Sequence, residues 1–182
     1  KHIFHVHTYR CKHASEELDE DYIKMALSFG VEKITFTDHC PFPENPFKNR
    51  MDMEQLSEYI DSLNHLKERY QKQIKIEIGL EVEFLSSMIK FYEELKHLNL
   101  NPLIIGKHFY QYPDGSFSFD DEDKSDEFIG CCNAMIEGMK TGLFNVVAHP
   151  DRFFRRCKKW TAEMRDISNE LIATAAQNNV IL

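Results

Sequence analysis

Hydrophobic and polar positions alternate along the chain with two periods, one typical of buried strands and one typical of amphipathic helices. Short β-branched or apolar runs predict strands, and runs with an apolar residue every three to four positions predict the helices between them. The predicted strands cover residues 3–6, 31–39, 74–84, 102–110 and 144–150, and a sixth begins at residue 180. The predicted helices cover residues 15–30, 52–66, 87–98, 125–142 and 161–176, and the acidic stretch 120–127 is expected to be a solvated loop that leads into the fourth helix.

Strands that are separated by helices of this length indicate βαβ units and a parallel sheet with right-handed crossovers. Repetition of the unit produces a doubly wound sheet or a closed barrel. In both architectures the functional residues gather at the carboxyl ends of the strands and in the loops that follow. A chain of 182 residues is long enough to bury one core, so we expect a single domain over residues 1–182.

Charge and composition restrict the partners of the protein. Lysine and arginine total 22 against 30 aspartates and glutamates, and a net charge of −8 disfavours nucleic acid and anionic lipid. A basic cluster at residues 152–159 could still bind a small anion. We find no apolar run of membrane-spanning length and no signal peptide, and the five cysteines include no paired CxxC motif, which predicts a cytoplasmic protein with reduced thiols. Two of them, Cys11 and Cys40, lie near histidine motifs and are interpreted as neighbours of a site, not as ligands.

Imidazole and carboxylate side chains recur where the predicted strands end. The positions are His5 and His7, Asp38 and His39, Glu81 and Glu83, His108, and His149, on five consecutive strands. A single histidine at a strand end is usually structural, but five coincidences at one edge favour a shared site. In an extended strand alternate side chains share a face, so His5 and His7 could hold one ion while Val6 turns into the core. The loop residue His13 could reach a neighbouring position.

Six histidines and one glutamate are too many ligands for one tetrahedral ion, which predicts two or three divalent metals. Glu81 has two oxygens and could bridge two cations, and Glu83 could support the ligands around it. Imidazole-rich sites with carboxylate bridges suit Zn, Mn or Fe better than Mg or Ca. Such clusters catalyse hydrolysis, because they generate hydroxide at neutral pH and neutralise phosphoryl oxygens.

The motifs "FHVHT", "FTDH", "GLEVEF", "GKHF" and "VVAHPDR", in this order and each at a strand end, resemble the polymerase and histidinol phosphatase (PHP) superfamily, and within it the histidinol-phosphatase branch. The resemblance implies a distorted seven-stranded (β/α) TIM-like barrel with a trinuclear metal centre. It implies that His5 and His7 hold one metal, which Glu81 bridges to a second. His108 and His149 would complete the second metal, and His13 and His39 would hold the third.

One family motif, Asp-x-His on the last strand, is absent before Leu182. The resemblance therefore implies a barrel without its C-terminal strands and a cluster open on two sides. We interpret the sequence as part of a longer protein. An inactive metal-binding domain is the alternative explanation for the missing motif.

The proline loop "DHCPFPENPFKNRM" and the phrase "HPDR" resemble the histidinol-phosphatase branch. They imply hydrolysis of L-histidinol phosphate, a small phosphorylated metabolite of histidine biosynthesis. A metal-bridging hydroxide, held by the ligands His5, His7, Glu81 and His108, would attack phosphorus. Another PHP phosphoesterase, acting on nucleotides or phosphotyrosine, is the rival hypothesis. Phosphate would be recognised by side chains that lie in loops or at strand ends beside a ligand, and the candidates are Arg50, Lys107 and Arg152.

Overall fold

The computed structural model describes residues 1–118, 125 and 127–182. The chain divides into two compact units, which are described separately here. Unit 1 comprises residues 1–81 and 100–102, and unit 2 comprises residues 82–99 and 103–182. The PHP-like motifs are divided between the units, with those of the first three strand ends in unit 1 except for Glu83.

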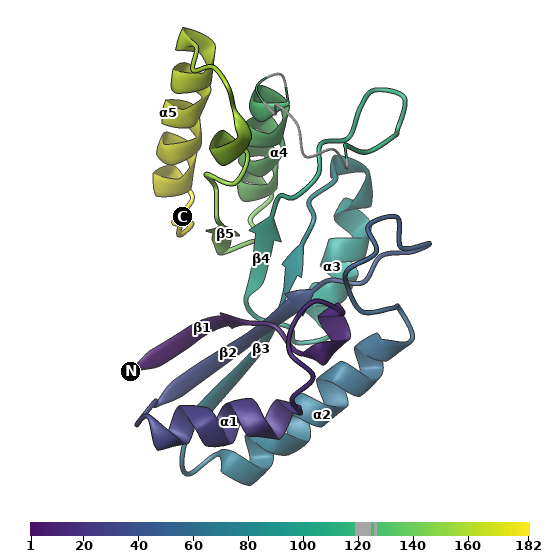
Figure 1. Cartoon of the computed structure of the whole chain (residues 1–182), viewed down its shortest axis with the longest axis vertical. Coiled ribbons are helices and arrows are strands. Elements are labelled where there is room, and N and C mark those ends of the chain that lie inside the picture. Colours follow the sequence, from purple (N-terminus) through teal and green to yellow (C-terminus); the bar gives the residue numbers. More distant parts are fainter. Residues whose placement is uncertain (119–124, 126) are drawn as a thin grey trace. The chain divides into compact units, whose positions relative to one another are not determined.

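Unit 1 is built on parallel strands that follow one another in the order β1 (His2–Val6), β2 (Lys33–His39) and β3 (Lys75–Val82). A 3-10 turn, η1 (Tyr9–Cys11), follows β1, and the crossover helices are α1 (Asp19–Ser28) and α2 (Gln55–Tyr70). Both helices lie along the same side of the three strands (Figure 1). Just before α2, the amide of Asp52 donates to Oε1 of Gln55 at 2.9 Å, a contact of the capping-box type.

The two faces of β2 differ in chemistry because successive side chains alternate. Ile34 and Phe36 are buried, and the Phe36 ring contacts Tyr22 of α1, so this is the helix-covered face. The opposite face carries Thr35, Thr37 and His39, which pair in register with Glu77, Gly79 and Glu81 of β3. Polar side chains therefore continue along one face of the sheet up to the strand ends where the predicted ligands lie.

Unit 2 contains a second parallel pair, β4 (Leu103–Gly106) and β5 (Val146–Ala148), with α4 (Phe128–Lys140) between them in sequence. The other elements are η2 (Ser86–Met88), α3 (Ile89–His97), η3 (Phe154–Arg156) and α5 (Ala162–Gln177). In Figure 1 α5 runs beside α4. A Cβ atom on Gly138 of α4 would lie 2.6 Å from the Ile105 side chain, so this glycine permits close helix-to-strand packing.

The predicted order of strands and helices is confirmed, with corrections at the ends of elements. The first helix begins at Asp19, not at residue 15, and a 3-10 turn occupies the start of the predicted third helix. Thr161 caps α5, because its side chain accepts a hydrogen bond from the Met164 amide. The predicted sixth strand is reduced to one bridge between Val146 and Ile181. Most of the acidic stretch 120–127 lies outside the described residues.

Within the described residues, no helix is both long and apolar enough to cross a membrane.

Candidate metal centre

Five predicted ligands of unit 1 converge on the carboxyl ends of β1, β2 and β3. One oxygen of Glu81, Oε2, lies 3.0 Å from Nδ1 of His39, 3.3 Å from Nε2 of His7 and 3.6 Å from Nε2 of His5. The Nε2 atoms of His5 and His7 are 3.5 Å apart. Glu81 is 1% exposed, so a carboxylate with little access to bulk water lies among these imidazoles.

The spacing of these donor atoms fits a small divalent cation. Tetrahedral coordination with metal–nitrogen distances near 2.0–2.1 Å requires donors about 3.3 Å apart. The His5, His7 and Glu81 donors lie 3.3 to 3.6 Å from one another, which is close to that spacing. Nitrogen lone pairs and a buried carboxylate that face one point would be stabilised by a positive ion there. These side chains therefore fit the metal that their residue types predict.

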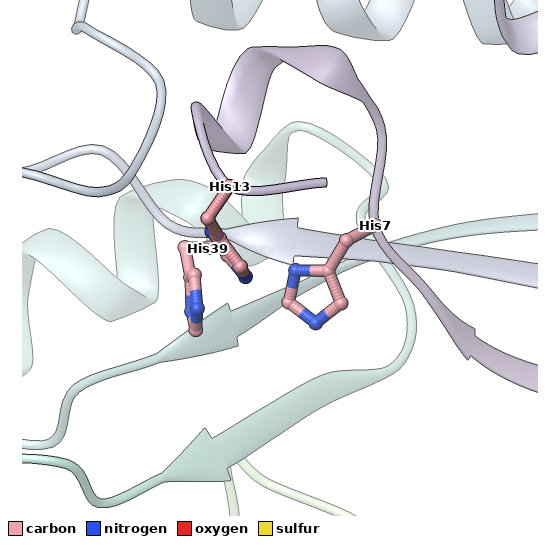
Figure 2. Close-up of side chains that lie close together, drawn as sticks. All are labelled: His7, His13 and His39. Carbon is pink, nitrogen blue, oxygen red and sulfur yellow. The ribbon is translucent and has the colours of Figure 1, made fainter. Parts of the chain in front are cut away.

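His13 joins the cluster from the loop after η1. The three rings of His7, His13 and His39 lie close together in Figure 2, with His13 5.0 Å from His39 and 5.4 Å from His7 between ring centroids. One donor atom from each of the three residues lies within 4.8 Å of the others. His7 thus belongs to three candidate donor groups: one with His5 and Glu81, one with His13 and His39, and one with Cys11 and Asp38.

The imidazoles of His5 and His7 do lie close together, but strand alternation, the reason given for this in the prediction, is wrong. Ile3 pairs with Ile34 and Val6 with Phe36, so β1 contains one more residue than β2 over this interval, as in a β-bulge. His5 has a φ of 67°, a left-handed conformation that is costly for a residue with a Cβ. Val6 is only partly buried. The bulge, not strand alternation, accompanies the approach of the two imidazoles.

A second set of hydrogen bonds occupies the other nitrogens of the imidazoles. Nδ1 of His5 lies 2.8 Å from Oγ1 of Thr37, and Nδ1 of His7 lies 3.2 Å from Sγ of Cys11. When these nitrogens carry the proton, the Nε2 lone pairs of both rings point to Glu81. Partners of this kind orient metal-binding histidines and select their tautomer.

The loop that carries His7 and His13 is anchored by a buried network. The carboxylate of Asp38 accepts hydrogen bonds from the amide and the hydroxyl of Thr8. Burial raises the pKa of Asp38, and the two bonds from Thr8 act against that rise. Arg10, only 1% exposed, donates to Thr8 Oγ1 and forms a bidentate pair with Asp19 of α1 at 2.8 and 2.9 Å. Sequence patterns did not reveal the role of Arg10, because a charge in a loop normally lies on the surface.

The two predicted ligands of unit 2 also meet. The ring centroids of His108 and His149 lie 4.9 Å apart. His149 has a φ of 37°, so a second predicted ligand adopts the left-handed conformation. Nδ1 of His108 lies 3.1 Å from Oε2 of Glu83, which leaves Nε2 as the nitrogen available to a metal. Glu83 thus has the supporting position that was predicted for it.

Glu83 is also held by the backbone amides of His108 and Phe109 and by the Lys107 ammonium, whose Nζ lies 3.1 Å from Oε1. Burial alone would raise the pKa of Glu83, but Lys107 and the hydrogen bonds from His108 and Phe109 lower it to about 2. The carboxylate therefore stays ionised across the neutral pH range and can accept a hydrogen bond from the Nδ1–H group of His108.

The predicted phosphate-binding cations have different surroundings. Lys107 is 4% exposed and contacts Glu83, and Arg50 is 2% exposed, with its guanidinium stacked on the Phe47 ring and donating to the Cys40 carbonyl. Arg152 is exposed, and its amide donates to the His149 carbonyl. Among these three residues only Arg152 presents its side chain to solvent. Their role in substrate binding stays a prediction.

Sequence comparison finds relatives that are named as histidinol-phosphatases. A histidinol-phosphatase of Bacillus subtilis is 31% identical over 141 residues, which cover 72% of this chain and 53% of that protein. A protein of Deinococcus radiodurans named a probable histidinol-phosphatase is 30% identical over 159 residues, covering 81% of this chain and 59% of its own length. The chain therefore spans little more than half the length of these relatives.

Structural comparison shows the fold. The crystal structure of histidinol phosphate phosphatase from Lactococcus lactis, complexed with Zn, L-histidinol and phosphate, matches all of this chain and 72% of its own with a TM-score of 0.76 at 22% identity. The predicted α/β fold class of the PHP phosphatases is thereby confirmed. The family model described as PHP domain matches residues 4–182. With its strand-end imidazoles and this match over nearly its whole length, the chain belongs to the PHP domain family.

Proposed function

We propose that the protein is a metal-dependent phosphomonoesterase that hydrolyses L-histidinol phosphate to L-histidinol and phosphate. The observation that carries the proposal is the group of imidazole nitrogens within 3.6 Å of one buried oxygen of Glu81. The relatives from Bacillus subtilis and Deinococcus radiodurans, both named as histidinol-phosphatases, support the choice of substrate. Histidine biosynthesis and a cytoplasmic location would follow from that activity.

The proposed centre binds two or three divalent ions. His5, His7 and Glu81 would hold one ion, and His13 and His39 would hold another, in agreement with two of the donor groups that contain His7. In unit 2, His108 and His149 would together hold a further ion. Zn is supported by its presence in the Lactococcus lactis complex, and Mn and Fe suit the same donors.

Bound metal ions supply hydroxide at neutral pH and neutralise charge on a phosphoryl group. The residues of this chain must keep the ligands neutral and oriented for that purpose. Thr37 and Cys11 contact Nδ1 of His5 and His7, and Glu83 contacts Nδ1 of His108. These contacts direct a nitrogen lone pair of each ring away from the supporting residue. Ligand geometry would then need little rearrangement when a metal binds.

Recognition of the phosphate is proposed for Arg152, Lys107 and Arg50. Arg152 is the best placed of the three for direct contact, because its side chain is exposed and its backbone is bonded to His149. A guanidinium can bind two phosphate oxygens at once. Lys107 and Arg50 are buried and engaged with protein groups, so their contribution would be to position Glu83 and the proline loop unless substrate binding displaces those contacts.

The substrate assignment is tested with the natural full-length protein and a panel of phosphomonoesters, assayed with added Zn or Mn. We expect histidinol phosphate to be hydrolysed far faster than nucleoside monophosphates or a phosphotyrosine peptide. Preference for a nucleotide or for phosphotyrosine would assign the protein to another phosphoesterase specificity. Absence of turnover on every substrate would overturn the catalytic proposal and favour a metal-binding domain.

The ligand assignment is tested by measuring metal content in His7→Ala and Glu81→Ala. Both variants should lose bound metal and phosphatase activity while the far-ultraviolet circular dichroism stays near that of the parent. His97→Ala, at the exposed end of α3, is the matched control and should keep both. Normal metal content in both site variants would contradict the proposed centre.

A further inference from the structure

Cys11 contacts three of the candidate ligands through two of its atoms, Sγ and the carbonyl oxygen. Its Sγ lies 3.2 Å from Nδ1 of His7 and accepts a hydrogen bond from the amide of His39 at 3.1 Å. Its carbonyl oxygen lies 2.9 Å from Nδ1 of His13. These are the three histidines of Figure 2: His7 and His13 follow β1, and His39 ends β2.

We propose that Cys11 is a positioning residue of the metal centre, which orients the rings of His7 and His13 and holds the end of β2 that carries His39. This inference rests on the proposed metal centre and adds a residue that would not touch metal or substrate. Its side chain acts by accepting hydrogen bonds, and its backbone carbonyl acts in the same way toward His13.

The hydrogen-bond directions follow from the positions of the atoms. Nε2 of His7 lies 3.3 Å from Glu81, so a metal there needs the Nε2 lone pair and leaves the proton on Nδ1. That Nδ1–H then donates to Sγ of Cys11. The Sγ atom of Cys11 also lies within 4.8 Å of a carboxylate oxygen of Asp38, toward which the S–H group can point.

The side chain of Cys11 has no exposed surface, so bulk water does not compete with its contacts to His7 and His39.

The position of Cys11 is fixed by the backbone around it. Its amide donates to the Thr8 carbonyl at 3.1 Å, which closes the η1 turn. Thr8 is bonded to Asp38, and Arg10 within the same turn is paired with Asp19 of α1. The thiol is therefore presented to His7 from a turn that is anchored at both strand β2 and helix α1.

The proposal is tested with Cys11→Ala and Cys11→Ser, with Cys132→Ala as the control because Cys132 is a buried thiol of α4 in unit 2. Zinc affinity is measured by competition with a chromophoric chelator. The tautomers of the imidazoles in metal-free protein are read from long-range ¹H–¹⁵N correlation spectra. We expect Cys11→Ala to weaken zinc binding about 10- to 100-fold and to remove the preference of His7 for the Nδ1–H tautomer. Cys11→Ser should restore part of both properties, and Cys132→Ala should change neither.

Failure of this inference can be separated from failure of the metal centre by including His7→Ala. If His7→Ala loses zinc but Cys11→Ala keeps parental affinity and the parental His7 tautomer, the centre stands and the positioning role of Cys11 is wrong. If His7→Ala keeps its zinc, the centre itself is wrong. Should Cys11→Ala fail to fold, Cys11→Ser supplies the same measurements, and an unchanged His7 tautomer and zinc affinity in it would overturn the proposal.

Discussion

Removal of Arg10 should destabilise the protein by leaving a buried carboxylate without its cation. In Arg10→Met the apolar stem is largely kept, while Asp19, 4% exposed, loses both guanidinium contacts and retains the hydroxyl of Ser62 at 2.6 Å. Breaking a buried ion pair from one side costs about 3–5 kcal/mol. The second partner of Arg10 is Glu58, whose side chain is half-exposed, so loss of this ion pair should lower the free energy of unfolding by at most about 1 kcal/mol.

We therefore expect Arg10→Met to lower the free energy of unfolding by about 4 kcal/mol, a large part of the 5–15 kcal/mol of an ordinary domain. For a chain of this size, that loss corresponds to a fall in Tm of about 8–16 °C. Urea unfolding followed by circular dichroism measures it. The double variant Arg10→Met with Asp19→Asn should recover much of the loss, because the buried charge is removed as well.

The matched control is Arg165→Met, since Arg165 forms its ion pair with Asp166 on the surface, where both side chains are more than half exposed. Its effect on unfolding should stay below about 1 kcal/mol. A loss below about 1 kcal/mol in Arg10→Met would refute the reasoning. So would a double variant that is less stable than Arg10→Met alone, because the penalty would then not come from the isolated carboxylate.

Three other outcomes follow from individual contacts. The pKa of Glu83 is lowered from 4.5 to about 2, so its ionised form adds about 3 kcal/mol to the free energy of unfolding above pH 4.5, and this contribution is lost as the pH falls toward 2. In metal-free Glu83→Gln, the free energy of unfolding should therefore depend less on pH between 4.5 and 2. An unchanged pH dependence would contradict this reasoning. Gly79→Ala would place a Cβ 2.0 Å from the Pro102 carbonyl oxygen, so its urea midpoint should fall by an amount equivalent to about 1–3 kcal/mol; a parental midpoint would show that β3 has room to adjust. Thr37→Val removes the hydroxyl that contacts Nδ1 of His5 and should weaken zinc binding about 10-fold, as measured by chelator competition. Thr35→Val is the control, because Thr35 contacts His2, which is not a predicted ligand, and it should leave zinc affinity unchanged. Equal effects of the two variants would argue against orientation of His5 by Thr37.

The strand-end ligand positions could be predicted because they depend on local patterns. Alternating strands and helices place successive strand ends at one edge, and each motif is read from a few adjacent residues. The structure does bring His5, His7, His13, His39 and Glu81 together, and it brings His108 to His149. Their service as ligands stays a prediction that the metal measurements must test.

The supporting residues could not be predicted in the same way. Thr37 lies 32 residues from His5, and Asp38 lies 30 residues from Thr8, so no periodicity or short spacing relates the partners. The bulge in β1 was missed for a similar reason, because it depends on the register with β2 and not on the composition of β1. The burial of Arg10 likewise depends on carboxylates supplied by α1 and α2.

Because β2 has a helix-covered face and a ligand-bearing face, insertions or deletions within this strand should be tolerated less well than substitutions. Removing one residue between Ile34 and His39 would exchange the two faces beyond that point and carry the His39 imidazole to the place of the Asp38 side chain. Insertions in the loop at residues 40–51 would leave this alternation intact. Among natural variants of this domain, we therefore expect length changes to accumulate in the loops after the strands and to be absent within the strands themselves.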